Sequence, residues 1–82
     1  MNCIYVLKSK KDGNIYIGFT SNIDKRIKEH NKGLVRSTKA RRPFILVYKE
    51  SFENKDEAIR REKYLKSGCG REYIKAVLSK GP

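Results

Sequence analysis

Apolar and aromatic residues occur in three short runs along this chain, and each run predicts a β-strand. The runs cover residues 3–9, 14–19 and 44–52 and are rich in β-branched and aromatic side chains. Between the first two lies Lys10-Lys11-Asp12-Gly13, which is typical of a turn and predicts a β-hairpin. The stretch Ile4-Tyr5-Val6-Leu7 does not alternate with polar residues, which indicates a central strand covered on both faces.

Capping residues and helical spacing predict three helices in the rest of the chain. They cover residues 22–31, a segment that begins after Asn54 and ends at residues 67–70, and residues 71–78. Ser21 or Asn22 caps the first helix, and Gly33 ends it. The order ββαβαα predicts an α+β fold, in which helices flank a three-stranded, mainly antiparallel sheet.

Chain length and charge narrow the possible functions. The 82 residues include 20 Lys and Arg against 9 Asp and Glu, which gives a formal charge of +11. A chain this short predicts one domain over residues 1–82, and it excludes a two-domain enzyme or a fold built around a large cofactor. The excess positive charge points to an anionic partner, and nucleic acid is the first candidate.

A membrane surface is the competing anionic partner. The sequence contains no run of 18 apolar residues, and its first ten residues lack the long apolar stretch of a signal peptide. We therefore expect a cytoplasmic protein without a membrane partner. Two cysteines, Cys3 and Cys69, are too few for a disulfide framework, and with the single His30 they cannot complete a four-ligand zinc site.

Basic residues are concentrated in residues 32–43, which contain no acid and no sustained apolar period. This pattern predicts an ordered basic loop, in which arginine side chains and the hydroxyls of Ser37 and Thr38 can bind phosphate. A solvated charged surface is the alternative. The predicted nucleic-acid-binding residues are Lys32, Arg36, Lys39, Arg41 and Arg42.

The first predicted helix carries polar side chains beside its apolar face. Ile23, Arg26, Ile27 and His30 follow the spacing i, i+3, i+4 and i+7, so they share one stripe of the helix. Arg26 and His30 are therefore candidates for a functional site. Alternatively, Arg26 lies along the edge of the stripe with its charged head in water.

A glutamate interrupts the apolar stripe of the second predicted helix. Ala58, Ile59, Glu62 and Leu65 form that stripe, and a buried carboxylate without a partner is strongly unfavourable. Glu62 must therefore pair with a cation, bind a metal ion or lie at the rim. The neighbouring cations Arg61, Lys63 and Lys66 are all candidate partners for such a pair.

Tyr5 and Tyr16 lie on the two strands of the predicted hairpin, at neighbouring and roughly facing positions. A tyrosine in a strand usually only packs against the sheet, and either residue alone has that explanation. Its hydroxyl becomes useful in catalysis where a cation or metal ion lowers its pKa from about 10.

Short motifs in a fixed order extend over nearly the whole chain. They are Cys3-Ile4-Tyr5, Tyr16-Ile17-Gly18, Arg26 with His30, Arg41-Arg42-Pro43, Leu46-Val47-Tyr48, and Ala58 with Arg61-Glu62. In this order and spacing the chain resembles the GIY-YIG nuclease family. It is most similar to the small stand-alone bacterial members, and it is also similar to the GIY-YIG catalytic domain of the excinuclease. The first signature opens with Cys3 in place of glycine.

The resemblance implies a site that holds one divalent metal ion. Tyr5 and Tyr16 match the signature tyrosines, Arg26 and His30 match the helix positions, and Glu62 matches the metal-binding glutamate. By resemblance, Glu62 binds Mg²⁺ or Mn²⁺, and Tyr16 is the general base, as a phenolate or hydrogen-bonded to Tyr5. Arg26 would bind the scissile phosphate and His30 would assist proton transfer. The sequence does not fix which tyrosine is the base.

We therefore expect a metal-dependent endonuclease that hydrolyses DNA phosphodiester bonds. Two alternatives stay open: a non-catalytic nucleic-acid-binding module of the same fold, and a small basic RNA-binding protein. RNA as the substrate and a protein partner that supplies targeting also stay open.

Overall fold

The computed structural model describes residues 2–79 and confirms the predicted α+β fold. In chain order the elements are β1 (Asn2–Ser9), β2 (Ile15–Thr20), α1 (Ile23–Lys32), the short 3₁₀ helix η1 (Lys39–Arg41), β3 (Phe44–Phe52), α2 (Lys55–Lys66) and α3 (Gly68–Ser79). The ends of the predicted domain, residue 1 and residues 80–82, lie outside the described residues, so a single domain over the whole chain stays a prediction.

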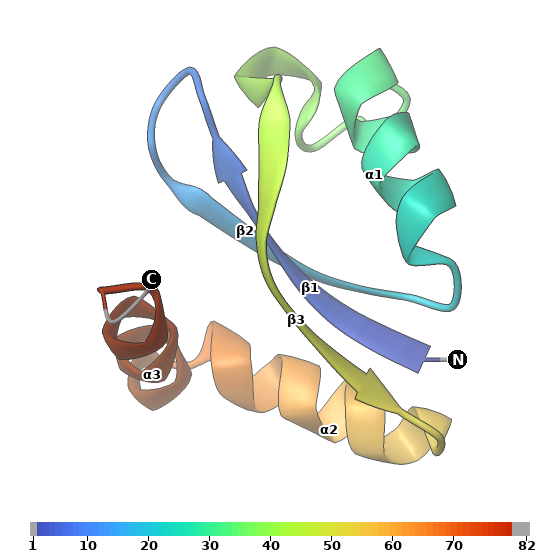
Figure 1. Cartoon of the computed structure of the whole chain (residues 1–82), viewed down its shortest axis with the longest axis vertical. Coiled ribbons are helices and arrows are strands. Elements are labelled where there is room, and N and C mark those ends of the chain that lie inside the picture. The colour runs from blue at the N-terminus through green and yellow to red at the C-terminus, as the bar shows by residue number, and fades with distance from the viewer. Residues whose placement is uncertain (1, 80–82) are drawn as a thin grey trace.

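The three strands form one antiparallel sheet in the order β2-β1-β3. Helix α1 lies over one face of this sheet, and α2 and α3 lie over the other (Figure 1). The hairpin between β1 and β2 turns at Gly13, whose φ of 75° suits a residue without a side chain. Among the described helices, none is both long and apolar enough to cross a membrane.

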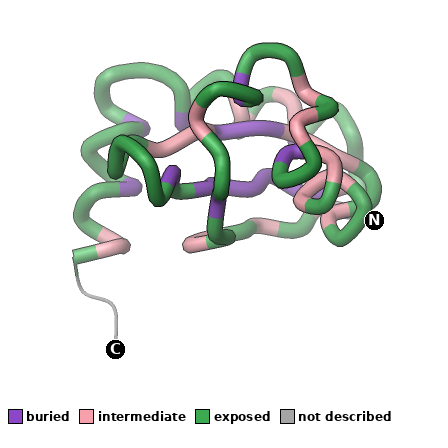
Figure 2. Tube along the Cα trace, turned by 90° about the horizontal axis from the view of Figure 1, so that it is seen from above, coloured by how far each residue is buried: buried purple, intermediate pink, exposed green. Residues whose placement is uncertain are grey.

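The central strand supplies side chains to two hydrophobic clusters. Ile4 and Val6 pack with residues of α2 and α3, whereas Tyr5 and Leu7 pack with Phe44 on the side of α1. The buried positions form a path through the middle of the molecule with exposed segments around it (Figure 2). The prediction of a central strand covered on both faces is therefore confirmed. Cys3 is a buried thiol and Cys69 an exposed one.

Both ends of α1 carry the predicted caps. The side chain of Asn22 accepts a hydrogen bond from the Lys25 N–H at 3.2 Å, so Asn22 is the N-cap. Gly33 adopts a φ of 80°, and its N–H donates to the carbonyls of Glu29 and His30. These caps set where α1 begins and ends, and the packing of Ile23 and Ile27 against the cluster of Tyr5, Leu7 and Phe44 turns the stripe with Arg26 and His30 towards the sheet.

The connection between α2 and α3 is tighter than predicted. The sequence pattern ends α2 at residues 67–70, but α3 already begins at Gly68 and only Ser67 separates the two helices. The Ser67 hydroxyl accepts the Gly70 N–H at 3.2 Å and caps the new helix. A side chain at Gly70 would collide with the Tyr64 carbonyl and the Leu65 backbone. Gly70 therefore permits close helix packing.

A charged clamp fixes α2 against β3. Arg61 donates from Nε and Nη2 to the two carboxylate oxygens of Glu50, at 2.8 and 3.0 Å. Tyr48 donates to the same carboxylate at 2.5 Å, and the Arg61 guanidinium lies 5.0 Å from the centre of the Tyr73 ring on α3. The hydrogen bonds from Arg61 hold the pKa of the Glu50 carboxyl below its ordinary value. The clamp positions the turn of α2 that carries Glu62.

Candidate active site

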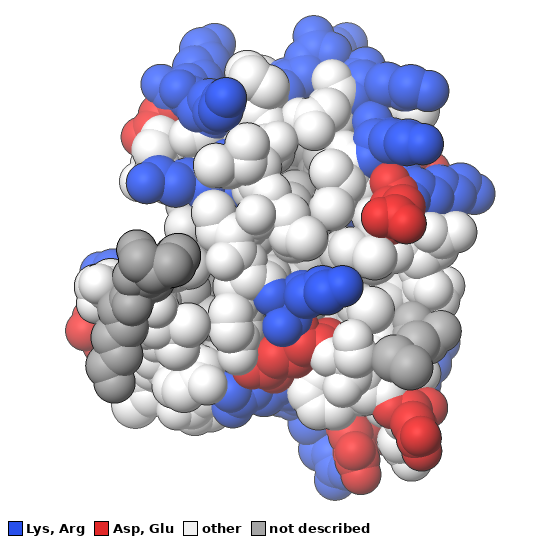
Figure 3. All heavy atoms as spheres, viewed as in Figure 1, with Lys and Arg blue, Asp and Glu red and all other residues white. Residues whose placement is uncertain are grey.

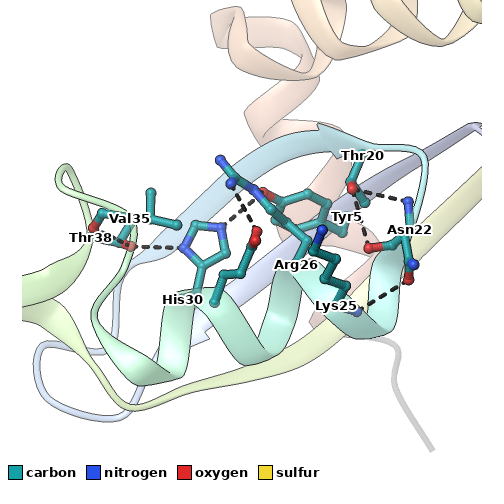
Figure 4. Close-up of polar contacts among 9 residues, drawn as sticks. Tyr5, Thr20, Asn22, Lys25, Arg26, His30, Val35 and Thr38 are labelled. Atoms are coloured by element: carbon teal, nitrogen blue, oxygen red, sulfur yellow. Dashed lines mark hydrogen bonds and ion pairs between the residues drawn. The ribbon is translucent and has the colours of Figure 1, made fainter.

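Three of the five predicted catalytic side chains meet at the Tyr5 hydroxyl (Figure 4). His30 Nε2 lies 2.9 Å from this oxygen, and Arg26 Nε donates to it at 3.4 Å. Tyr5 comes from the middle of β1, whereas Arg26 and His30 lie one turn apart on α1. Because residues four apart share one face of a helix, both reach the same side of the sheet.

The hydrogen bonds around His30 connect its two ring nitrogens to different partners. Nδ1 is 2.7 Å from the Thr38 hydroxyl, and this hydroxyl also lies 3.4 Å from the Val35 carbonyl. When the Thr38 proton points to Val35, Thr38 accepts from Nδ1–H, and Nε2 accepts the proton of Tyr5. In this tautomer the unprotonated nitrogen of His30 faces the Tyr5 hydroxyl.

Burial shifts the pKa values of both partners. Desolvation lowers the pKa of His30 below its ordinary value, and the nearby charge of Arg26 lowers it further. Desolvation raises the pKa of Tyr5, whereas the hydrogen bond from Arg26 acts in the opposite direction. At neutral pH both groups are uncharged in the free protein, and the Arg26 guanidinium is placed to stabilise a negative charge on the Tyr5 oxygen.

Tyr16 lies diagonally beside Tyr5 on the same face of the hairpin. In the antiparallel pairing of β1 with β2, Tyr16 lies opposite Leu7 and Tyr5 lies opposite Gly18. The centroids of the two tyrosine rings are 6.3 Å apart. The Tyr16 ring also lies 5.1 Å from that of His30. The Tyr5 hydroxyl occupies the space that a side chain at Gly18 would need. Only glycine at position 18 therefore leaves room for the Tyr5 side chain. The glycine of the second signature is needed because of the tyrosine of the first.

Arg26 has contacts both inside and at the surface. Its Nη1 forms an ion pair with Glu29 Oε1 at 3.2 Å, and its side chain remains 36% exposed. It lines an open hollow of about 490 Å³ at the start of α1, between Phe19 on β2 and Glu29. An anion in this hollow could bind the guanidinium while Nε still faces Tyr5.

Glu62 is paired with a local cation, one of the alternatives that the sequence left open. Its carboxylate lies 3.1 Å from Lys66 Nζ, one helical turn later, and its side chain is 22% exposed. The Glu62 charge contributes to the raised pKa of Tyr5, so the carboxylate lies within electrostatic reach of the hydroxyl. Among the described residues, no hydrogen bond joins Glu62 to the other four predicted catalytic residues.

The donor set suits a hard divalent ion bound by few protein groups. Within residues 2–79, no cluster of three or more His, Cys, Asp and Glu side chains could form a metal cage. Mg²⁺ commonly uses one or two carboxylates and completes its shell with water and substrate phosphate oxygens. Glu62 fits that pattern, and an ion at this position would displace Lys66.

The predicted basic loop keeps most of its charges at the surface. Lys32, Arg36, Lys39 and Arg42 are exposed. Arg41 instead pairs with Asp12 at 2.8 Å and lies 5.6 Å from the centre of the Phe44 ring, which joins η1 to the hairpin turn. Lysines and arginines gather over the end of the molecule formed by the hairpin turn, η1 and the end of α1 (Figure 3).

One side chain of the site has a role that the sequence did not predict, and for Glu62 the sequence left several partners open. The loop pattern assigns Thr38 to phosphate binding, but Thr38 is fully buried and orients His30. No local pattern could reveal this, because the path of the loop over α1 brings the two together. Lys66 was one of several candidate partners of Glu62, and its i+4 spacing was the signal that favoured it.

Comparison with known proteins gives a consistent result. The family model of the GIY-YIG catalytic domain matches residues 1–73. A UPF0213 protein of Clostridium perfringens is 46% identical over 81 residues, which is 98% of this chain and 86% of the relative. A UPF0213 protein of Staphylococcus haemolyticus is 41% identical over 75 residues, which is 90% of each chain.

A solved structure extends the similarity to the fold. The solution NMR structure of the UPF0213 protein BH0048 from Bacillus halodurans superposes with a TM-score of 0.59 at 40% sequence identity. The match covers 100% of this chain and 89% of that chain.

Proposed function

The chain belongs to the GIY-YIG family, and from this premise we propose that it is a nuclease that hydrolyses DNA phosphodiester bonds with a divalent metal ion. The observation that carries the proposal is the 2.9 Å contact between the Tyr5 hydroxyl and His30 Nε2. A buried phenol that faces a neutral imidazole and an arginine has the parts of a general base.

In the proposed reaction, Tyr5 is the residue that activates water. As the water oxygen attacks phosphorus, the water proton moves to the Tyr5 oxygen and the Tyr5 proton moves to His30 Nε2. The bond between phosphorus and the 3′ oxygen breaks, and the 3′ oxygen takes a proton from solvent. The products are a 5′ phosphate and a 3′ hydroxyl. This step uses the tautomer in which Thr38 accepts from Nδ1–H, so that the imidazole accepts the proton at Nε2.

Arg26 and Tyr16 would act on the phosphate. The Arg26 guanidinium is partly exposed, so it can bind the non-bridging oxygens while charge builds on them. Tyr16 is only half-buried, and among the described residues its hydroxyl has no hydrogen-bond partner. It is therefore available to donate to the phosphate or to the attacking water. This assigns the base to Tyr5 and positioning to Tyr16, in contrast to the role that the family resemblance implies for Tyr16.

Glu62 would hold the metal ion. Mg²⁺ or Mn²⁺ bound there would neutralise charge on the phosphate and on the departing oxygen. A positive charge at Glu62 would also oppose the influence of this carboxylate on Tyr5, whose pKa the carboxylate helps to raise.

The experiment is cleavage of labelled single-stranded, duplex and branched DNA, with an RNA arm, in Mg²⁺ or Mn²⁺ and with an EDTA control. We expect Tyr5→Phe to lose at least about 100-fold in rate, a typical contribution of one catalytic proton-transfer group, and Glu62→Ala to lose the metal-dependent cleavage. Tyr16→Phe should lose less, and Tyr64→Phe, at an exposed tyrosine outside the site, should cut normally. Full activity in Tyr5→Phe together with loss in Tyr16→Phe would move the base to Tyr16.

A second candidate is a nucleic-acid-binding module that does not cut. The ion pair between Glu62 and Lys66 favours it, because the carboxylate is neutralised without a metal ion. Salt-sensitive DNA binding that is unchanged in Glu62→Ala, with no metal-dependent cleavage of any substrate in the panel, would support this candidate over the nuclease.

A further inference from the structure

Strand β2 forms one edge of the sheet and has hollows beside it. In the order β2-β1-β3 it has a neighbour on one side only. One hollow lies beside Asn14 and Ile15, a second beside residues 15–17, and a third beside Phe19 and Thr20. Tyr16 lines the second, Arg26 lines the third, and the Tyr5 hydroxyl lies against Gly18. The proposed reacting groups thus lie towards the end of β2 that leads to α1.

The two hollows at the start of β2 are strongly basic. Arg41, Lys66, Arg71 and Lys75 line the first two hollows, of about 460 and 230 Å³, which adjoin because Ile15, Arg41 and Arg71 line both. We call this part of the surface the α3 groove. Its four cations come from η1, α2 and α3, so only the folded chain brings them together.

The acidic partners of these cations do not cancel the charge of the groove. Arg41 pairs with Asp12 and Lys66 with Glu62, whereas Lys75 is 3.8 Å from Glu72 in a pair whose side chains are largely exposed. Arg71 donates from Nε to the Lys66 carbonyl at 3.3 Å, and it has no carboxylate partner among the described residues. Arg71 and Lys75 are therefore the cations most available to an incoming anion.

We propose that the DNA strand runs along the edge of β2 and that the α3 groove binds its phosphates on one side of the scissile bond. Arg71 and Lys75 lie one turn apart on the same face of α3, so they can contact phosphates along one strand. Strand β2 has six residues, which span about 20 Å, the axial length of about six nucleotides of duplex. The α3 groove is a second phosphate surface beside the predicted loop.

This inference rests on the proposed function, because the reacting groups fix where the scissile phosphate lies. Strand β2 starts on the side of α3 and ends where the chain enters α1 (Figure 1). The DNA strand would therefore enter over Arg71 and Lys75, pass Tyr16, and present its scissile phosphate to Arg26 at the far end.

The test compares two double variants that lose the same charge. Arg71→Gln with Lys75→Gln alters the α3 groove, whereas Arg60→Gln with Lys63→Gln alters exposed residues of α2 outside all three hollows. Binding of a fluorescently labelled DNA to each full-length protein is measured by anisotropy in EDTA, over 50–200 mM salt. Circular dichroism then shows that both variants fold.

We expect the groove variant to lose at least about tenfold in affinity and to lower the salt slope by about two, since each phosphate contact contributes about 0.9. The α2 variant should keep the wild-type slope. Equal losses of affinity in both variants would show that only the net charge of the protein matters. Unchanged affinity in the groove variant would show that the DNA strand does not bind in the α3 groove.

Cleavage of the same DNA with Mg²⁺ separates the two proposals. If the wild type cuts and the groove variant binds and cuts like the wild type, the proposal of DNA binding in the α3 groove is wrong, whereas the nuclease proposal is supported. If no protein cuts but the groove variant alone binds weakly, the α3 groove stands as a DNA surface and the nuclease proposal fails.

Discussion

His30, the chain's one histidine, is held uncharged inside the fold, so its titration should be visible in stability. Its folded pKa lies below its ordinary value of 6.5 because of burial and of Arg26. Between these two pKa values the unfolded chain binds more protons than the folded one, so stability rises with pH in this window. The free energy of unfolding should therefore fall as pH drops below about 6.5, by at most about 1.4 kcal/mol per pH unit.

Urea unfolding of the wild type and of His30→Gln between pH 7 and pH 5 measures this dependence. The variant should show a flatter profile, because the depressed pKa values of Asp12 and Glu50 affect stability only below about pH 4.5. A wild type that becomes more stable on acidification would mean that His30 is charged in the fold.

Lys66 competes with any metal ion for the Glu62 carboxylate. The 3.1 Å pair is partly solvated, and such pairs contribute about 0.2–1 kcal/mol. Lys66→Met should therefore bind Mn²⁺ up to about fivefold more tightly than the wild type in calorimetric titration without nucleic acid. Lys63→Met removes the same charge from an exposed position on α2. Equal gains in both variants would show a general charge effect instead of release of Glu62.

At the residue scale, spacing along the sequence predicted which candidate side chains lie together, but it could not predict the other residues that contact them. The four-residue interval between Arg26 and His30 and the hairpin register of Tyr5 and Tyr16 were readable, because both follow from regular backbone geometry. The contact of His30 with Thr38 depends on an irregular loop, so no periodicity encoded it.

At the scale of elements, the α2–α3 junction makes opposite predictions for two nearby glycines. A methyl group at Gly70 would meet the Tyr64 carbonyl and the Leu65 backbone, whereas at Gly68 it would meet nothing within 4 Å. Gly70→Ala should destabilise the protein by about 1–3 kcal/mol through overpacking. Gly68→Ala should be neutral or stabilise it by up to about 1 kcal/mol through helix propensity.

Thermal unfolding of the two alanine variants compares them directly. In a domain of this size 1 kcal/mol corresponds to roughly 4–8 °C, so the midpoints should separate clearly. A Gly70→Ala protein as stable as Gly68→Ala would show that α3 can shift away from α2 at little cost.

The same junction shows why sequence patterns predicted the strands better than the start of α3. The third strand has the predicted bounds, because its composition and flanking turns agree. Two glycines near a helix end normally indicate termination, so the pattern of residues 67–70 predicts a break. Here position 70 must lack a side chain because it lies against the backbone of α2. Local sequence propensity cannot reveal such a requirement, since it depends on how two helices pack.

At the scale of the whole molecule, a charge of +11 on 82 residues acts on folding and on binding with opposite signs. Self-repulsion destabilises the compact state, most strongly where lysines and arginines gather over the hairpin turn, η1 and the end of α1 (Figure 3). Salt screens this repulsion, since the Debye length falls from about 10 Å at 0.1 M to about 3 Å at 1 M. The same salt weakens DNA binding, because bound phosphates release counterions.

We therefore expect the thermal midpoint at pH 7 to rise between 50 and 500 mM NaCl, while DNA affinity falls. With five to eight phosphate contacts, the affinity should drop about 500- to 20,000-fold between 50 and 200 mM salt. Near pH 9.9, where the net charge is zero, the salt dependence of the midpoint should vanish. A midpoint at pH 7 that does not rise with salt would mean that repulsion is already relieved by ion pairs such as Arg41 with Asp12. The surplus charge would then act on binding alone.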